Sequence, residues 1–279
     1  MTLATKLERG PVVIDGGLAT ELETLGHDIS GRLWSARLLR DSPADIEAVH
    51  RAFFEAGADV AISASYQATF EGFGADAEQL LRRSVELAGR ARDELRPDGL
   101  VAASVGPYAV LLADRSEYTG DYRGASEEQI AAFQRPRIEA LLRAAPDLLA
   151  FETVPSIVEV RALAGLLGEL GDVETWITFC CRDGERLSDG TPVEEAVAAA
   201  TAGAPPTALG VNCTEPRYVG SLLERMRAVT GLPLLAYPNG VGPIEPEAVA
   251  RWRESGARGI GGCCRVGPDG IAAIAAALR

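Results

Sequence analysis

Three of the five cysteines stand in two short segments that could share one metal ion. Cys213 ends the first segment, and Cys263 and Cys264 follow two glycines in the second. A zinc ion that does chemistry usually takes three protein ligands and keeps its fourth position for water or a substrate. The glycines would let the backbone bend so that two adjacent thiolates reach one ion. Spacing alone leaves open the alternative that these cysteines fill the core as small hydrophobic residues.

The other two cysteines, Cys180 and Cys181, lie in a strand-like run and are predicted to be core residues. A disulfide between the adjacent Cys263 and Cys264 would be strained. The N-terminal residues have neither the apolar run nor the small-residue cleavage site of a secretory signal, and no stretch is long enough to span a membrane. We therefore expect a cytoplasmic protein whose cysteines serve a metal or catalysis.

An all-sulfur zinc site suits the binding of one further thiolate, because the three thiolates make the ion electron-rich and a poor Lewis acid. A substrate thiol would lose its proton there and remain nucleophilic enough to attack an activated methyl group. If the methyl donor is a sulfonium, its leaving group departs as a neutral thioether and needs no general acid. Hydrolytic zinc chemistry would instead favour neutral histidine ligands and a proton acceptor.

The scarcity of lysine and histidine agrees with such a reaction. Lys6 is the only lysine, and the only histidines are His27, in a loop, and His50, on the face of a predicted helix. Schiff-base chemistry needs an amine that can lose its proton. Lysine-dependent aldolases and pyridoxal phosphate enzymes are therefore poor candidates.

Composition places the chain among ordinary globular proteins. Of its 279 residues, 47% are hydrophobic and 24% are charged, so a sizeable core can form. The formal net charge of -13 repels phosphate backbones and anionic membrane surfaces. Neither nucleic acid nor a membrane is an expected partner.

Eight strand-like runs alternate with helical segments, and no flexible linker interrupts them. This pattern predicts an α/β fold, a single (β/α)8 TIM barrel domain over residues 1–279. An open doubly wound sheet is the second choice, because Asp15-Gly16-Gly17 lacks the third glycine of a dinucleotide-binding fingerprint. The predicted strands cover residues 12–16, 60–66, 100–105, 148–153, 175–181, 208–213, 234–238 and 259–264. The predicted helices cover residues 44–56, 75–95, 127–144, 157–170, 193–202, 218–229, 247–255 and 269–278.

A barrel of this kind places its active site at the carboxyl ends of the strands. Polar residues and cysteines stand at the ends of several predicted strands. Residues far apart in the sequence would therefore meet in one barrel mouth. They are Asp15, Tyr66, Gln67, Glu152, Asn212, Cys213, Asn239, Cys263 and Cys264.

Nine short segments carry a resemblance to a known family. They are DGGLATELE at 15–23, LWSAR at 33–37, ASYQAT at 64–69, SVGPY at 104–108, FET at 151–153, LSDGT at 187–191, GVNC at 210–213, YPN at 237–239 and GGCCR at 261–265. In this order, over nearly the whole chain, they closely resemble the homocysteine S-methyltransferase family, especially its S-methylmethionine-dependent branch. The resemblance implies a zinc-dependent barrel in which Cys213, Cys263 and Cys264 hold the ion and the homocysteine sulfur takes the fourth position.

The same resemblance implies a set of substrate-binding residues. Glu152 would hold the homocysteine ammonium, since a carboxylate pairs well with a charged amine. Trp34 could offer its ring face to a sulfonium cation, or could be a packing residue. The full implied set is Asp15, Gly16, Trp34, Tyr66, Glu152 and Asn212, in which Tyr66 and Asn212 either line the pocket or support it.

The leading interpretation is methyl transfer from S-methylmethionine or S-adenosylmethionine to homocysteine, giving methionine. Betaine or a cobalamin-bound methyl could be the donor instead, and selenocysteine the acceptor. From other classes, a non-catalytic zinc- or thiol-binding protein and a phosphate-handling barrel isomerase remain open. One departure from the family concerns the seventh loop, where Gly240-Val241-Gly242-Pro243 leads quickly into a helix and a longer family insertion is missing. Donor preference and closure of the site are what this departure puts in doubt.

Overall fold

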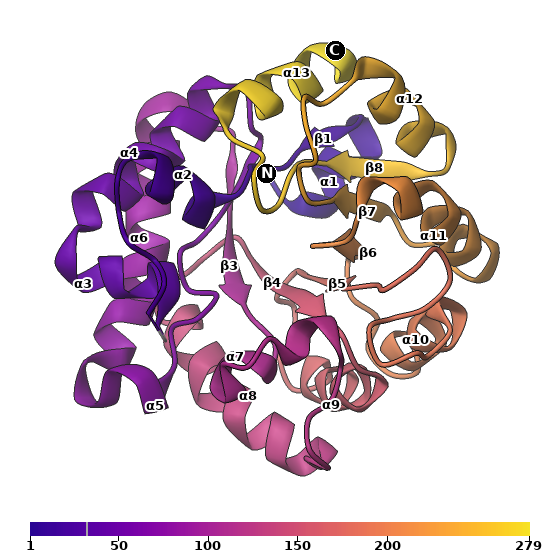
Figure 1. The fold of residues 1–279 in the computed structure, drawn as a ribbon, viewed down its shortest axis with the longest axis horizontal. Coiled ribbons are helices and arrows are strands. Elements are labelled where there is room, and N and C mark those ends of the chain that lie inside the picture. The colour runs from indigo at the N-terminus through magenta and orange to yellow at the C-terminus, as the bar shows by residue number, and fades with distance from the viewer. Residues whose placement is uncertain (32) are drawn as a thin grey trace.

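Eight parallel strands form a barrel in the computed structural model, which describes residues 1–31 and 33–279. Their hydrogen-bonded order is β1-β8-β7-β6-β5-β4-β3-β2, and a parallel bridge between Ile14 and Val60 joins the first strand to the second and closes the ring. Figure 1 shows the strands around a central axis with the helices outside them. The predicted α/β class and (β/α)8 barrel are confirmed, and the open sheet was the wrong alternative.

The strands and the helices that cover them alternate as the sequence pattern predicts. The strands are β1 (Val12–Val13), β2 (Val60–Ile62), β3 (Leu100–Val105), β4 (Leu148–Val154), β5 (Thr175–Phe179), β6 (Ala208–Asn212), β7 (Leu234–Tyr237) and β8 (Ala257–Ile260). The covering helices are α4 (Pro43–Glu55), α6 (Ala77–Leu95), α8 (Glu127–Leu142), α9 (Ile157–Leu167), α10 (Val193–Ala200), α11 (Pro216–Val229), α12 (Pro246–Glu254) and α13 (Pro268–Leu278).

Several shorter helices were not predicted, and most of them lie in the loops at the mouth of the barrel. They are α1 (Leu3–Arg9), α2 (Leu18–Thr24), η1 (Trp34–Arg37), α3 (Leu38–Asp41), α5 (Phe70–Phe73), η2 (Gly74–Asp76), α7 (Ala109–Leu112) and η3 (Ser116–Tyr118). The segments of three or four residues among these are too short to show helical periodicity, which explains why sequence reasoning missed those segments.

Local chemistry sets several of the helix ends. Ser126 and Gln129 form a reciprocal capping box at the start of α8. Gly57 and Gly256 follow α4 and α12 with φ of +107° and +114°, where a residue without a Cβ is favoured. Both helices end within one residue of the ends predicted at residues 56 and 255.

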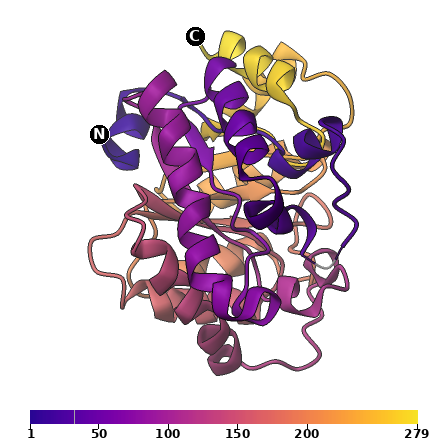
Figure 2. The same ribbon diagram turned by 90° about the vertical axis from the view of Figure 1, so that its left-hand side faces the viewer.

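The barrel interior is packed with alternating strand side chains, and α1 closes its amino-terminal end. Leu3 and Leu7 of α1 join a buried cluster with interior residues such as Trp176 and Tyr237. The carboxylate of Glu174, just before β5, accepts hydrogen bonds from the backbone of Leu3 at 2.6 Å and of Ala4 at 2.9 Å. Figure 2 shows α1 and α2 at opposite ends of the molecule. The cavity mouth is therefore at the end that α1 leaves open.

Several strands end earlier than the sequence pattern predicts. β1 ends at Val13 rather than at residue 16, β2 at Ile62 rather than at 66, and β8 at Ile260 rather than at 264. The extra residues, which are mostly small or polar, have left the sheet. Asp15, Gly16, Tyr66, Cys263 and Cys264 therefore stand in loops just past the strands, whereas Glu152 and Asn212 lie within β4 and β6. No helix in the described part of the chain is long and apolar enough to cross a membrane.

His50 is a buried residue of α4 rather than a polar group on its outer face. Its side chain is fully buried, and neither ring nitrogen has a hydrogen-bond partner among the described residues. Burial lowers the pKa of His50 from 6.5 to about 4. The folded protein therefore holds this ring neutral at a pH where the unfolded chain protonates it.

We predict that His50 makes the protein sensitive to mild acid. Because the unfolded state binds the proton first, stability falls as the pH drops from 6.5 to about 4, by about 3 kcal/mol in total. A His50→Leu variant should lack this loss when the free energy of unfolding in urea is measured across that range. His27→Leu serves as the control because it leaves His50 in place. Parallel pH curves for wild type and His50→Leu would refute the prediction.

Candidate active site

A cavity of about 550 Å³ opens at the carboxyl ends of the strands. Its walls come from the loops after β1, β2, β3, β6 and β8 and from the carboxyl ends of β2, β4 and β7 themselves. This volume lies in the range of small-molecule sites. Of the residues predicted to meet in the barrel mouth or to bind substrate, all line it except Asp15, Asn212 and Asn239; Asp15 and Asn212 are buried beside lining residues. The residues that line it as predicted are Gly16, Trp34, Tyr66, Gln67, Glu152, Cys213, Cys263 and Cys264.

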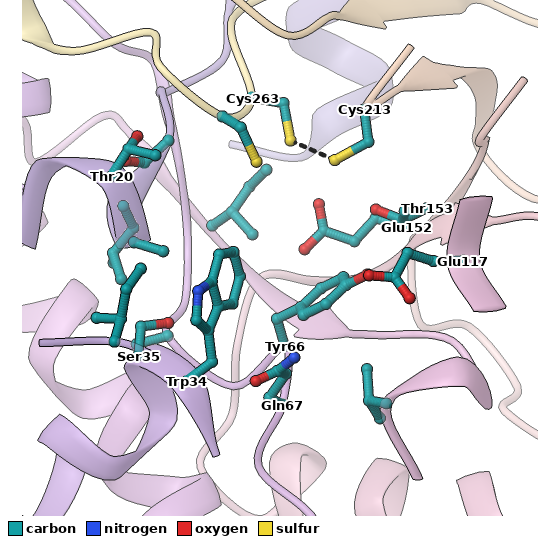
Figure 3. A pocket seen from close by; sticks show the side chains of 18 of the residues that line it. Thr20, Trp34, Ser35, Tyr66, Gln67, Glu117, Glu152, Thr153, Cys213 and Cys263 are labelled. Atoms are coloured by element: carbon teal, nitrogen blue, oxygen red, sulfur yellow. Dashed lines mark hydrogen bonds between the residues drawn. The ribbon is translucent and has the colours of Figure 1, made fainter. Parts of the chain in front are cut away.

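The three predicted metal ligands converge at the inner end of this cavity. The sulfur atoms of Cys213, Cys263 and Cys264 all lie within 4.8 Å of one another, and the Cys213 and Cys263 sulfurs are 2.7 Å apart (Figure 3). Hydrogen bonds to Cys263 and Cys264, together with burial, raise the pKa of Cys213. Hydrogen bonds from Cys213 and Cys263 lower the pKa of Cys264 to about 3. Without a cation, one thiol of the cluster is therefore ionised more easily than the others, and a bound cation would neutralise the charge of the thiolates.

The backbone at Cys213 is held in an unusual conformation. Its φ is +48°, and its carbonyl accepts hydrogen bonds from Asn239 Nδ2 at 3.1 Å and from Cys180 Sγ at 3.7 Å. The adjacent Thr214 hydroxyl accepts from the Cys181 backbone N–H at 3.0 Å. Cys180 and Cys181 are buried as predicted. They also tie the end of β5 to the turn that aims Cys213.

The glycines before Cys263 are needed for space, which corrects the reason given for them above. Neither Gly261 nor Gly262 has a positive φ. A Cβ on Gly261 would lie 2.6 Å from the Ile14 carbonyl oxygen, and one on Gly262 would lie 2.2 Å from Val266. The cysteine pair therefore reaches the site because its backbone packs directly against the end of β1.

Glu152 is the buried carboxylate that faces the cavity from β4. Ser104 donates its hydroxyl hydrogen to it, and burial raises the pKa of Glu152 to about 7. Next to it, Thr153 has a φ of +61°. Asn212 fixes this strained residue, since it accepts from the Thr153 backbone N–H at 2.7 Å and donates to the Thr153 hydroxyl at 2.8 Å. Asn212 thus supports the wall at Glu152.

Asp15 lies behind the cavity wall and holds the start of the next loop. Its carboxylate accepts from the Ile62 backbone N–H at 2.8 Å, while its other oxygen has no partner among the described residues. Burial, with the nearby Glu152, raises the pKa of Asp15 well above its ordinary value. Gly16 does line the cavity, and a Cβ there would lie 2.3 Å from the Val266 carbonyl oxygen.

Two aromatic side chains form a corner of the cavity opposite the cysteines. The rings of Trp34 and Tyr66 meet edge-on with centroids 6.3 Å apart, and both side chains lie beside the open space in Figure 3. Burial raises the pKa of Tyr66 well above its ordinary value. Trp34 therefore does not serve as an ordinary core residue, and its ring is available to a ligand.

Backbone strain gathers around this cavity. Eight described residues other than glycine have a positive φ, a conformation that side chains with a Cβ rarely adopt. Five of them line the cavity. Strained residues of this kind persist where the surrounding structure holds them, and they concentrate at functional sites. The five are Trp34, Ala113, Arg115, Thr153 and Cys213.

A buried arginine that sequence reasoning missed shapes the corner at Tyr66. Arg137 of α8 is fully buried and donates to the carbonyl oxygens of Tyr66 at 2.9 Å, Ala68 at 3.0 Å and Gly106 at 2.8 Å. Burial lowers the pKa of Arg137 to about 10, although Glu159 opposes this. A lone arginine in a helical pattern gives no signal of such a role, because most arginines are solvated.

The comparisons with known proteins identify the family of this chain. Residues 12–278 match the sequence profile described as homocysteine S-methyltransferase. The chain belongs to the homocysteine S-methyltransferase family. It is 42% identical to homocysteine S-methyltransferase YbgG of Bacillus subtilis, with 96% of this chain and 94% of the relative covered. It is 40% identical to selenocysteine Se-methyltransferase of Brassica oleracea, with 95% and 88% covered.

A solved structure of the family superimposes closely. The metallated form of the homocysteine methyltransferase MmuM from Escherichia coli gives a TM-score of 0.90 at 44% identity, covering 96% of both chains. The apo form of the same protein gives a TM-score of 0.82. The oxidized form gives a TM-score of 0.89. The alignment with YbgG spans 298 positions, more than the 279 residues present here, so that relative has segments that this chain lacks.

We predict that Arg137 stabilises the protein through its buried contacts. An Arg137→Met variant should lose about 3–5 kcal/mol of unfolding free energy, because it leaves three buried carbonyl groups and the side-chain oxygen of Gln134 without their donor. Arg135→Met is the matched control on the same helix, since its pair with Glu169 is exposed and should contribute no more than about 1 kcal/mol. Urea unfolding of both variants measures the difference, and equal losses would contradict the prediction.

Proposed function

We propose that this chain, as one barrel domain over residues 1–279, is a zinc-dependent methyltransferase. It moves a methyl group from a sulfonium donor, with S-methylmethionine as the first choice and S-adenosylmethionine as the second, to the thiol of homocysteine, giving methionine. The observation that carries the proposal is the convergence of three cysteine sulfurs at the inner end of a cavity in a member of this family. The cytoplasmic location stays a prediction.

The donor set fits zinc. Three sulfur ligands within 4.8 Å of one another, from two separate loops, match the three-ligand pattern of catalytic zinc. Soft thiolate ligands favour zinc over magnesium or calcium, which prefer oxygen. When bound by Cys213, Cys263 and Cys264, zinc would keep a substrate thiol deprotonated at neutral pH.

The chemical step is a displacement at a methyl carbon. The homocysteine sulfur forms the new carbon–sulfur bond, the bond from the methyl carbon to the sulfonium sulfur breaks, and its electron pair stays on the departing neutral thioether. No group has to protonate this leaving group. The described residues that line the cavity include neither histidine nor lysine, which agrees with a reaction that needs no general acid.

The chain's own side chains would orient the two substrates. Glu152 would accept hydrogen bonds from the homocysteine ammonium, which would also favour its ionised form. Gly16, with Asp15 behind it, would face the amino-acid part of homocysteine. The Trp34 and Tyr66 rings would lie against the sulfonium, since cations bind to aromatic faces.

One relative supports a second acceptor. The 40% identity to a selenocysteine Se-methyltransferase makes selenocysteine a candidate in place of homocysteine. The displacement and the donor would be the same, because a selenolate also binds to zinc and attacks a methyl carbon. Rates with homocysteine and selenocysteine at equal concentration would rank the two acceptors.

We predict that removing one ligand abolishes both metal binding and activity. Cys213→Ser should lose most of its zinc, measured by mass spectrometry of the metal, and at least about 100-fold in kcat/KM. Cys181→Ala, a buried cysteine outside the cluster, should keep its zinc. A chelator should inactivate the wild type, and added zinc should restore it. A Cys213→Ser protein with full metal content and full activity would overturn the mechanism.

Product analysis by mass spectrometry tests the donor. Wild-type protein with zinc and homocysteine should form methionine from S-methylmethionine or S-adenosylmethionine. Betaine should support less transfer, because an amine is a poorer leaving group than a neutral thioether. Binding of homocysteine without product from any donor would favour a non-catalytic thiol-binding protein instead.

A further inference from the structure

The loop between β3 and α8 forms the outer wall of the cavity and has not been assigned a role so far. It contains α7 and η3, and it presents Arg115, Glu117 and Tyr118 to the cavity. Arg115 is one of the strained residues, with a φ of +67°. This conformation turns the chain so that both Arg115 and Glu117 line the open space.

This wall is fixed to the barrel, although it is irregular. The Glu117 carbonyl accepts a hydrogen bond from the Ser188 hydroxyl at 3.1 Å, and the same hydroxyl contacts the Cys180 carbonyl at 3.1 Å. Gly120 packs so closely on Asp189 that a Cβ there would lie 2.5 Å away. An ion pair between Asp114 and Arg123 spans the loop. Glu117 therefore has a defined position beside the cavity.

This wall carries two charged side chains, Arg115 and Glu117. Within residues 1–31 and 33–279, neither side chain forms a salt bridge, whereas Arg123 in the same loop is paired with Asp114. Burial raises the pKa of Glu117, and Arg115 partly offsets that effect. A half-buried carboxylate that faces a cavity is stabilised when a cationic ligand binds there.

The position of Glu117 relative to Tyr66 indicates which ligand group it meets. Figure 3 shows the Glu117 carboxylate beside the hydroxyl end of Tyr66, with the Glu152 carboxylate between Tyr66 and the cysteines. The charges of Cys213 and Glu117 both act on the Tyr66 hydroxyl. A donor whose sulfonium lies against Tyr66 near the cysteines would extend its remaining chain outward, toward the loop after β3.

We propose that Arg115 and Glu117 form a binding site for the α-amino-acid headgroup of the methyl donor. Glu117 accepts hydrogen bonds from its ammonium, and Arg115 donates to its carboxylate. Arg115 is the one guanidinium among the described residues that line the cavity, and a zwitterionic headgroup needs one partner of each sign. This inference rests on the proposed function, and it assigns the donor class as sulfonium compounds that carry a free α-amino-acid group.

The first test compares donors with and without that headgroup. With zinc-loaded protein and homocysteine, Glu117→Gln and Arg115→Gln should each raise the KM for S-methylmethionine about tenfold or more. The KM for homocysteine should change less than about twofold. Inhibition by trimethylsulfonium, a cation without the headgroup, should be equally strong in the wild type and both variants. Glu86→Gln and Arg82→Gln on the outer face of α6 are the matched controls, since they remove the same charges at exposed positions.

Three kinetic outcomes would overturn the assignment. An unchanged KM for S-methylmethionine would show that the pair does not bind the donor. Equal losses for S-methylmethionine and trimethylsulfonium would show that the pair acts only through its charge on the sulfonium. A rise in the KM for homocysteine alone would place the acceptor headgroup there.

Calorimetry separates this inference from the proposed function. S-methylmethionine is titrated into zinc-loaded wild type, Glu117→Gln and Arg115→Gln without homocysteine. Binding to the wild type that weakens about tenfold in both variants supports the headgroup site, even if no methyl transfer is found and the proposed function fails. Equal binding in all three proteins overturns the site while activity can stand. If the wild type neither binds nor turns over S-methylmethionine or S-adenosylmethionine, both proposals fail.

Discussion

Bringing three thiols to one point is the constraint on which the rest of this barrel mouth depends. Three sulfur atoms within 4.8 Å repel one another once they ionise, and in a buried place little water screens them. Such a cluster is stable when a cation replaces the thiol protons. Every other feature of the inner cavity follows from holding Cys213, Cys263 and Cys264 in that position from two separate loops.

The backbone around the cysteines is adapted to this demand. Cys213 is held at a φ of +48° by hydrogen bonds from Asn239 and Cys180 to its carbonyl. The second loop comes close to the end of β1 because Gly261 leaves no side chain between them, and Gly262 leaves room for Val266 of the same loop. The Gly240 backbone N–H, in turn, donates to the Cys264 carbonyl at 2.7 Å. The turn after β7 thus holds both cysteine segments, and these contacts come from its first residues.

The sequence predicted the barrel and the cluster because both have strong local signals. Eight buried runs separated by amphipathic helices leave few alternatives, and cysteines at two strand ends are easy to find. The ends of β1, β2 and β8 were predicted too late, since the strand pairing stops before the polar and glycine residues that the prediction included. Arg137 and Glu117 gave no signal. Their positions depend on contacts with Tyr66 and Ser188, each 71 residues away in the sequence, and on irregular loops whose conformation no periodicity describes.

The charges that line the cavity indicate more about the proposed substrates than the net charge of the chain does. The surface carries many acidic residues, but most of its arginines are paired with them. The cavity lining has two carboxylates, a thiol cluster, four aromatic side chains and a single arginine. Such a lining favours ligands with more positive than negative charge. A sulfonium amino acid carries two cations and one carboxylate, whereas homocysteine carries one of each and a thiol. The charges of the cavity therefore suit the two proposed substrates. The additional positive charge of the donor lies on the sulfonium that carries the transferred methyl group.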